Sequence, residues 1–317
     1  MSCLACLKES PALLLEGALG ERLKREYHLS FDPQIAMARL VEREEGRQSL
    51  ETLWREYRES ARRHRLPFLA TTPTRRANRE RVARAGCGDR LFWENLEFLR
   101  QVRQAGEGEM YVGGLMGCRG DAYTGQGALA QREARVFHSW AAQRFAQAGA
   151  DFLMAGIMPT LPEAAGMAQA MGETGLPYLI SFTLRGDGCL IDGTPLSQAI
   201  AYIDQISDYT PAGYMANCLH PLILEEALGQ PCNRVPLVRE RFWGLQANTA
   251  CLPYDQLDRL EEAPEGTPPE VLAEQMLRLR ERFGLRLFGG CCGTTGAHLE
   301  AIARRLEQAV RQEGENV

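Results

Sequence analysis

The chain has 317 residues, 45% of them hydrophobic, so it is long enough to bury a large core. Its formal net charge of −5 argues against a general nucleic-acid or anionic-membrane binder, which would carry a basic excess. No apolar run approaches the roughly 20 residues of a membrane span, and the N-terminus lacks the basic region of a signal peptide. We therefore expect a cytoplasmic protein whose ten cysteines are thiols or metal ligands rather than disulfides.

Eight short apolar runs recur along the chain. They are near-continuously hydrophobic rather than alternating, which is typical of parallel strands buried on both faces. The runs cover residues 12–17, 66–71, 110–117, 151–156, 177–183, 213–218, 242–248 and 285–292.

The segments between these runs have helical features. Residues 131–149 carry apolar side chains at helical spacing and end at a glycine. In residues 267–284, Thr267 is the predicted N-cap and Glu270 completes a capping box. The arginine-rich residues 75–84 are interpreted as a solvated helix face.

Eight strands that alternate with helices predict an α/β fold of the (β/α)8 barrel type. A doubly wound open sheet is the alternative, but no G-x-G-x-x-G follows the first strand, so dinucleotide binding has no support. The proline-rich residues 261–270 are a loop too short to separate domains. We expect one barrel domain over residues 1–317.

Three cysteines fall at the ends of two predicted strands. Cys218 ends the sixth run, and Cys291 and Cys292 end the eighth, within "GGCCGTTG". The C-terminal strand ends of such a barrel open onto one mouth, and three thiolates there can hold Zn²⁺ with its fourth position open. We therefore predict a zinc site at these three residues. Taken alone, "GGCC" would favour two buried core thiols, and the isolated Cys3–Cys6 pair is not expected to bind metal.

Adjacent side chains of a regular strand point to opposite faces, so the backbone has to bend if both neighbouring thiols are to reach one ion. Gly289, Gly290 and Gly293 are expected to allow that bend, because glycine reaches torsions forbidden to other residues. An open zinc position suits a thiol substrate, since coordination deprotonates it. No H-E-x-x-H motif is present. Alkylation of a bound thiolate is therefore favoured, because it needs the fewest further catalytic groups.

These motifs resemble the homocysteine S-methyltransferase family, zinc-dependent barrels that methylate the thiol of homocysteine. "GGCCGTTGAHLEAIA" is similar to the family's final signature, and Asn217–Cys218 to its first zinc-ligand motif. Residues 15–23, 149–166, 179–196 and 246–255 resemble four further segments. The resemblance covers nearly the whole chain and implies no catalytic group beyond the zinc-activated thiol. It implies substrate contacts from Glu16, Gly17, Asn217 and Asn248.

The chain departs from the family at the amino-group site. The family's opening Asp is Glu16 here, and its following Thr is Glu21. Its strand-four Glu-Thr pair, whose acid helps to hold the homocysteine amino group, is replaced by Gly156 and Ile157. Either the longer Glu16 reaches the ammonium alone, or the acceptor is a thiol without an amino group. A Gly156→Glu variant is then expected to improve the use of homocysteine.

The resemblance implies an S-methyltransferase that acts on homocysteine or a related small thiol. The methyl donor is expected to be a small onium compound such as S-methylmethionine, or a methyl-corrinoid on a separate protein. The alternatives are an enzyme for a non-amino-acid thiol and a non-catalytic zinc-binding barrel. Arg119 and Arg185 are interpreted as solvated loop residues rather than a carboxylate clamp, and Cys118 and Cys251 as incidental thiols.

Overall fold

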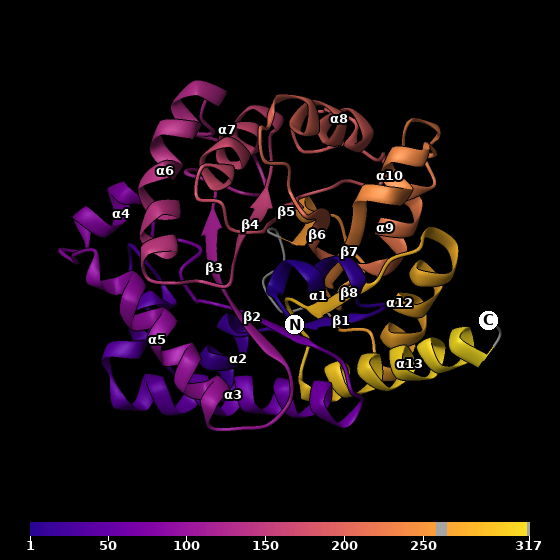
Figure 1. The fold of residues 1–317 in the computed structure, drawn as a ribbon, viewed down its shortest axis with the longest axis horizontal. Coiled ribbons are helices and arrows are strands. Elements are labelled where there is room, and N and C mark those ends of the chain that lie inside the picture. The colour runs from indigo at the N-terminus through magenta and orange to yellow at the C-terminus, as the bar shows by residue number, and fades with distance from the viewer. Residues whose placement is uncertain (258–264, 316–317) are drawn as a thin grey trace.

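Eight parallel strands close into a barrel in the computed structural model, which describes residues 1–257 and 265–315 (Figure 1). Neighbouring strands pair in chain order, and β1 pairs with β8 to complete the ring. Each predicted run overlaps one strand, so the predicted (β/α)8 barrel is confirmed. The strands are β1 (Leu13–Leu15), β2 (Phe68–Thr71), β3 (Met110–Gly117), β4 (Phe152–Met158), β5 (Tyr178–Phe182), β6 (Gly213–Leu219), β7 (Phe242–Ala247) and β8 (Leu287–Gly290).

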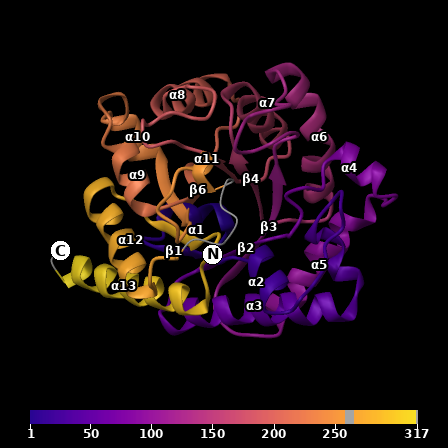
Figure 2. The same ribbon diagram turned by 180° about the vertical axis from the view of Figure 1, so that it is seen from behind.

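Helices surround the barrel (Figures 1 and 2). Those before β5 are α1 (Cys3–Glu9), α2 (Gly20–Arg25), η1 (Met37–Glu42), α3 (Glu44–Arg63), α4 (Arg79–Arg84), α5 (Arg90–Gln104), α6 (Gln131–Gln147) and α7 (Leu161–Gly172). Those after it are α8 (Leu196–Ile206), α9 (Pro221–Leu228), η2 (Pro231–Asn233), α10 (Pro236–Arg241), α11 (Tyr254–Leu257), α12 (Pro269–Phe283) and α13 (Gly296–Glu315). Among the described helices, none is both long and apolar enough to cross a membrane.

Helix α1 closes the end of the barrel at which the strands begin, and it lies across the barrel centre in Figure 1. Its Cys6 and Leu7 are fully buried against the inward-facing side chains of the strands. The hydroxyl of Tyr111, at the start of β3, donates to the carbonyl of Met1 at 2.9 Å. The isolated Cys3–Cys6 pair therefore belongs to a packed plug, and burial raises the pKa of both thiols.

The predicted start of the helix before the eighth strand differs from the structure. Thr267 is not an N-cap, because α12 begins at Pro269 and Pro268 stands at the cap position without a side-chain cap bond. The Thr267 hydroxyl is instead 3.0 Å from Nε2 of His220, in the segment after β6. The proline-rich residues 261–270 are predicted as a loop. Of these, 261–264 lie outside the described residues, 265–268 form no helix or strand, and 269–270 already belong to α12, where the prediction is wrong.

The arginine-rich stretch is only partly helical. Asn78 caps α4 by accepting from the backbone N–H of Arg81 at 3.0 Å, and this cap fixes the start of the helix at Arg79. Arg75 and Arg76 precede the cap, in the loop that follows β2. The interpretation of all of 75–84 as a solvated helix face is therefore wrong for its first residues.

Candidate functional site

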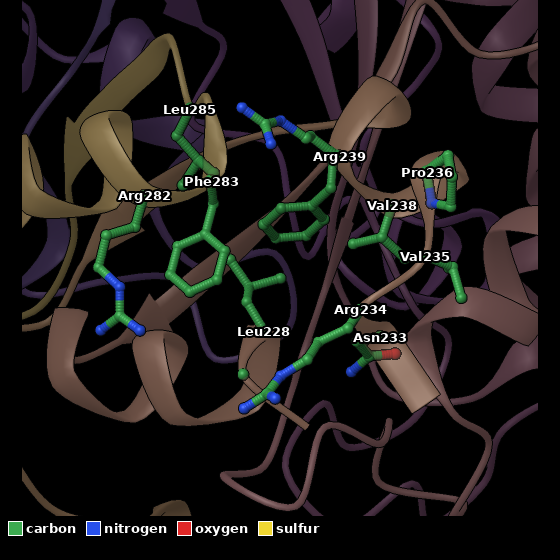
Figure 3. Close-up of a pocket in the computed structure, with 12 residues that line it drawn as sticks. Leu228, Asn233, Arg234, Val235, Pro236, Val238, Arg239, Arg282, Phe283 and Leu285 are labelled. Atoms are coloured by element: carbon green, nitrogen blue, oxygen red, sulfur yellow. The ribbon is translucent and has the colours of Figure 1, made fainter. Parts of the chain in front are cut away.

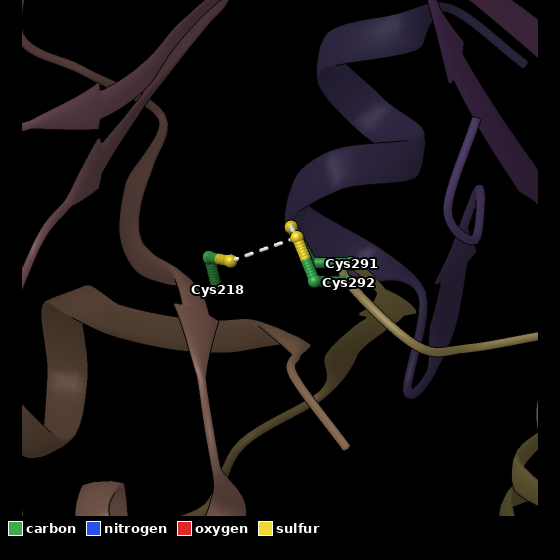
Figure 4. Close-up of side chains that lie close together, drawn as sticks. All are labelled: Cys218, Cys291 and Cys292. Carbon is green, nitrogen blue, oxygen red and sulfur yellow. Dashed lines mark hydrogen bonds between the residues drawn. The ribbon is translucent and has the colours of Figure 1, made fainter. Parts of the chain in front are cut away.

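Three thiols meet at the end of the barrel where β6 and β8 finish (Figure 4). The Sγ atoms of Cys218 and Cys292 are 3.4 Å apart, and those of Cys291 and Cys292 are 4.0 Å apart. All three sulfur atoms lie within 4.8 Å of one another. Three thiolates bound tetrahedrally to one zinc ion at about 2.3 Å have sulfur atoms about 3.8 Å apart. The spacing of the three thiols therefore fits a single metal ion.

A backbone irregularity aims Cys218 into the mouth. Its φ of 58° is left-handed, and the β6–β7 register shifts between Asn217 and Leu219. A non-glycine residue in this conformation is strained and persists where its surroundings determine it, most often at functional sites. On the opposite side, the Cys291 N–H donates to the Ala247 carbonyl at 2.7 Å, which ties the paired cysteines to β7.

The glycines beside the paired cysteines have two different roles. Only Gly293 has a left-handed φ, 78°, and there a Cβ would also overlap Oγ1 of Thr249. A Cβ on Gly289 would lie 2.6 Å from a β1 side chain, and one on Gly290 would overlap Oγ1 of Thr294. The expected backbone freedom is thus needed at Gly293, whereas the other two glycines allow close packing.

The pKa values of the three thiols are shifted in opposite directions. Hydrogen bonding with Cys291 and then Cys292 lowers the pKa of Cys218 well below its ordinary value. Hydrogen bonding with Cys218 raises the pKa of Cys291 and of Cys292. Asn248 Nδ2 donates to the Cys218 sulfur at 3.6 Å. Binding of a cation by all three sulfurs is therefore coupled to the release of the remaining protons.

Two tyrosines stand beside the thiols. Tyr123, in the loop after β3, and Tyr254, at the start of α11, have ring centroids 5.1 Å apart. The Tyr254 hydroxyl donates to the Asn217 carbonyl at 3.1 Å, and Tyr123 hydrogen-bonds to Cys218. Burial, reinforced by the nearby cysteines, raises the pKa of both phenols well above the ordinary value, so both stay neutral. The sequence reasoning missed both residues, although Tyr254 lies in the quoted segment 246–255.

A buried acid holds the loop that carries Tyr123. The Glu163 carboxylate accepts from the backbone N–H of Arg119 at 2.6 Å and from that of Leu129 at 3.3 Å. It also lies 3.0 Å from Nε2 of His138, and its side chain is fully buried. Both ends of the loop are therefore fastened to α7, which keeps Tyr123 at the mouth.

The predicted acid at the end of β1 is already hydrogen-bonded. Glu16 is only 4% exposed, and its carboxylate accepts from the Trp54 indole at 3.2 Å, from the Thr71 N–H at 2.7 Å and from the Thr71 hydroxyl. Burial raises the pKa of Glu16 to about 7, against the effect of these hydrogen bonds. Its carboxylate is thus directed at α3 and β2.

Glu16 is expected to make the stability of the fold depend on pH. Its pKa is 4.5 ordinarily and about 7 when folded, so the folded state holds the proton more tightly. This contribution is complete below pH 4.5 and is lost as the pH rises through 7. Relative to Glu16→Gln, the free energy of unfolding of the unaltered protein should fall by about 3 kcal/mol between pH 4.5 and 8. Urea titrations of both proteins across this range measure it, and a constant difference would contradict it.

The other predicted substrate residues lie in different surroundings. Asn248 lies against the thiols through its hydrogen bond to Cys218. The Asn217 amide accepts from the Ser181 hydroxyl and donates to Gln246, so it belongs to a polar chain across β5, β6 and β7. A Cβ on Gly17 would lie 2.8 Å from side chains of both α3 and α13, so this glycine serves close packing.

The remaining candidates lie apart from the thiols. Arg119 is paired with Glu80 at 3.1 Å, and Arg185 with Asp187 at 2.8 Å. This agrees with their interpretation as loop residues rather than a clamp. In the described part of the chain the single three-residue cluster that fits a metal is the one above, so neither Cys118 nor Cys251 joins it.

An apolar pocket of about 470 Å³ lies elsewhere, among α9, α10 and α12 (Figure 3). Side chains such as Leu228, Val238 and Phe283 line it, with Arg234 and Arg239 among them. None of the predicted site residues lines this pocket, so it is separate from the thiol site.

Fold and site together define a (β/α)8 barrel with a three-thiol centre at its C-terminal mouth. The homocysteine S-methyltransferase family model matches residues 13–306, and the chain belongs to this family. The predicted family is therefore confirmed.

Characterised relatives are distant. The chain is 26% identical over 191 residues to the homocysteine S-methyltransferase YbgG of Bacillus subtilis, over 58% of this chain and 56% of the relative. It is 27% identical over 240 residues to the homocysteine S-methyltransferase of Escherichia coli, and this match covers 68% of this chain and 71% of the relative. It is 26% identical over 258 residues to the S-methylmethionine–homocysteine S-methyltransferase of Mus musculus, and this match covers 75% of this chain and 63% of the relative. The match thus spans little more than half of the Bacillus relative.

The fold is also that of a solved structure. The metallated form of the homocysteine methyltransferase MmuM from Escherichia coli superposes with a TM-score of 0.75 at 22% sequence identity. The superposition covers 95% of this chain and 98% of that one. The oxidized form gives the same values. At this sequence identity, the structural similarity shows a shared fold and nothing further.

Proposed function

We propose that this protein is a zinc-dependent S-methyltransferase that moves a methyl group from a small sulfonium donor to the thiol of a small acceptor. The convergence of Cys218, Cys291 and Cys292 at the mouth carries the proposal. Family membership supports it, as does the metallated form of the related Escherichia coli enzyme. Three thiolates suit zinc and leave a fourth position for substrate.

The three cysteines would hold the ion, and zinc bound there supplies Lewis acidity that keeps an acceptor thiol deprotonated at neutral pH. Neighbouring residues orient these ligands. Asn248 donates to Cys218, the Thr294 hydroxyl donates to the Cys291 carbonyl at 2.7 Å, and Glu21 accepts from the Gly293 N–H at 2.5 Å. Such partners fix the direction of metal ligands and affect metal affinity.

Methyl transfer from a sulfonium needs little further chemistry. The acceptor thiolate forms the new S–CH3 bond with its electron pair, while the donor's S–CH3 bond breaks and leaves a neutral thioether. No proton has to be supplied to the leaving group, which agrees with the lack of a predicted catalytic acid or base. The single barrel, residues 1–317, provides both substrate sites in this proposal.

The Tyr123–Tyr254 pair supports a sulfonium donor over a corrinoid protein. Aromatic faces attract cations by about 0.5–2 kcal/mol, and these two rings stand next to the thiols. Because both phenols stay neutral, they add no charge that would have to be compensated once the donor has lost its methyl group. The mouse relative is named for S-methylmethionine, a donor of this chemical class.

A donor assay with and without a chelator tests the proposal. The zinc-loaded protein is incubated with a panel of small thiols and either S-methylmethionine or methylcobalamin. We expect thiol-dependent loss of the methyl group from S-methylmethionine that stops when zinc is removed, and no loss from methylcobalamin. If no thiol is methylated from either donor although zinc is bound, the protein is a non-catalytic zinc-binding barrel.

A further inference from the structure

An arginine side chain lies beside Gly156, the residue that stands where the family's acid is expected. Gly156, two residues before the end of β4, is in register with Gly117 at the end of β3. A Cβ on Gly117 would lie 2.7 Å from Cγ of Arg75. One on Gly156 would lie 2.9 Å from Cδ1 of Leu115 and 3.8 Å from Cδ of Arg75. The Arg75 side chain therefore lies beside this glycine pair, and it shares the space next to Gly156 with Leu115.

Ile157, the next residue, is strained in the same region. Its φ is 57°, and the β4–β5 register shifts between Ala155 and Met158. Backbone strain of this kind clusters at ligand-binding positions. Among non-glycine residues within the strands, left-handed φ values occur at Cys218 and Ile157, both near the mouth. The end of β4 is therefore shaped in a way that points to a ligand there.

Arg75 forms no ion pair within 4.0 Å in the part of the chain that the structure describes, although its charge helps to lower the pKa of Asp121. Its side chain is partly buried, yet no carboxylate lies within 4.0 Å of its guanidinium, in contrast to Arg119 and Arg185. A guanidinium offers a planar fork of N–H donors that matches carboxylate and sulfonate oxygens. A partly buried fork of this kind favours an anionic ligand.

A cavity of about 250 Å³ lies beside Arg75, and Tyr123 stands between this cavity and the thiols. Arg75, Arg76, Arg81 and Tyr123 line it, together with Asp121. The lining carries three guanidinium groups against one carboxylate, and Asp121 Oδ1 already accepts from the backbone N–H groups of residues 123 and 124 at 2.9 and 2.8 Å. Tyr123 also lies beside Cys218, so this one residue borders both the thiols and the arginine-lined cavity.

We infer that the acceptor is a short thiol whose far end is a carboxylate or sulfonate and which lacks an α-ammonium, and that Arg75 determines this specificity. The inference rests on the proposed function. An ammonium in the place of the missing acid would face an unpaired guanidinium, and the repulsion excludes it. Glu16 does not offset this charge, because its carboxylate is occupied by Thr71 and Trp54.

The inference changes what is expected of Gly156→Glu. A carboxylate introduced there would lie beside Arg75 and pair with it. The single variant should therefore bind homocysteine little better than the unaltered protein does. The double variant Arg75→Gln/Gly156→Glu removes the guanidinium and leaves the new acid free for an ammonium. We expect only the double variant to prefer homocysteine over 4-mercaptobutyrate, which is the same molecule without the amino group.

Calorimetric binding to the zinc-loaded protein tests Arg75 directly. The probes are 4-mercaptobutyrate, the neutral 4-mercaptobutan-1-ol and homocysteine. Arg75→Gln should lower the affinity for 4-mercaptobutyrate about ten- to a hundredfold, the range for one lost hydrogen bond to a charged group. The affinity for the alcohol should not change. Arg75→Lys should retain part of the preference. Arg185→Gln, which removes a mouth arginine already paired with Asp187, should change nothing.

Methyl-transfer rates with the same three thiols separate the two proposals. Tighter binding of homocysteine than of 4-mercaptobutyrate by the unaltered protein, or equal weakening of all three thiols by Arg75→Gln, would overturn the inference about Arg75. The proposed function would stand in either case if methyl groups are still transferred. If the anionic thiol binds with the expected preference but no donor loses a methyl group, the anion site stands and the methyltransferase proposal fails.

Discussion

Alanine in place of Cys218, Cys291 or Cys292 is expected to release the metal ion and to abolish methyl transfer. Structural zinc sites bind with about 10–16 kcal/mol, so one thiolate of such a set accounts for roughly 3–4 kcal/mol. Its loss should lower zinc affinity by about a hundred- to a thousandfold. Two ligands are too few to hold the ion against a mild chelator, and the acceptor thiol is then protonated at neutral pH. Elemental analysis after dialysis and the methyl-transfer assay measure both effects.

Alanine variants of cysteines outside the cluster are the matched controls. Cys118 lies after β3, with its pKa raised by burial to about 11, and Cys251 is exposed. Cys3 belongs to the plug at the opposite end of the barrel. All three variants should keep full zinc occupancy. Full occupancy in the Cys291→Ala/Cys292→Ala double variant would rule out the assignment of the metal ligands.

Gly293→Ala is expected to disturb the metal site without removing a ligand. The residue has a φ of 78°, and an added Cβ would overlap Oγ1 of Thr249. Left-handed strain contributes about 1–2 kcal/mol and overpacking about 1–3 kcal/mol, so the free energy of unfolding should fall by about 2–5 kcal/mol. Because Cys292 is the preceding residue, relief of the overlap moves its thiol, and zinc affinity should fall at least about tenfold. Urea unfolding and competition with a chelating dye measure the two quantities.

The Gly284→Ala variant is a control that introduces left-handed backbone strain without steric overlap. This glycine ends α12 with a φ of 77°, nearly the same as at Gly293, but no atom lies within 4 Å of its added Cβ. The control should therefore lose only the strain energy, about 1–2 kcal/mol, and keep its zinc affinity. Equal effects of the two substitutions on zinc binding would show that the overlap with Thr249 does not position Cys292.

Much of the fold and the thiol cluster could be predicted from local pattern. Parallel strands covered on both faces are continuously apolar, so residues such as 151–156 indicate a strand without knowledge of their partners. A barrel brings the C-terminal ends of all its strands to one mouth, so cysteines that end the sixth and eighth runs are expected to meet there. Cys218 and Cys291 lie 73 positions apart in the chain, yet the topology alone predicts their proximity.

Helix ends and the purpose of individual glycines were less predictable. Thr267 has the residue type of an N-cap, but a contact with His220 from another loop competes for its hydroxyl. Gly289 and Gly290 stand next to a bend, but close neighbours from β1 and the following turn explain them better than their torsions do. Contacts between loops decide such details, and no local pattern in the chain records those contacts.

By itself, the sequence determined the barrel, the three thiols and the loss of the family's strand-four acid, because each depends on residue type at a strand or strand end. Only the tertiary structure decided which groups surround the acceptor. It turned Glu16 toward Thr71 and Trp54, and it placed Arg75 beside Gly117 and Gly156, near the ends of β3 and β4. These outcomes depend on side-chain direction and on packing between distant loops. The free energy of such contacts is set by neighbours that are far apart in the chain.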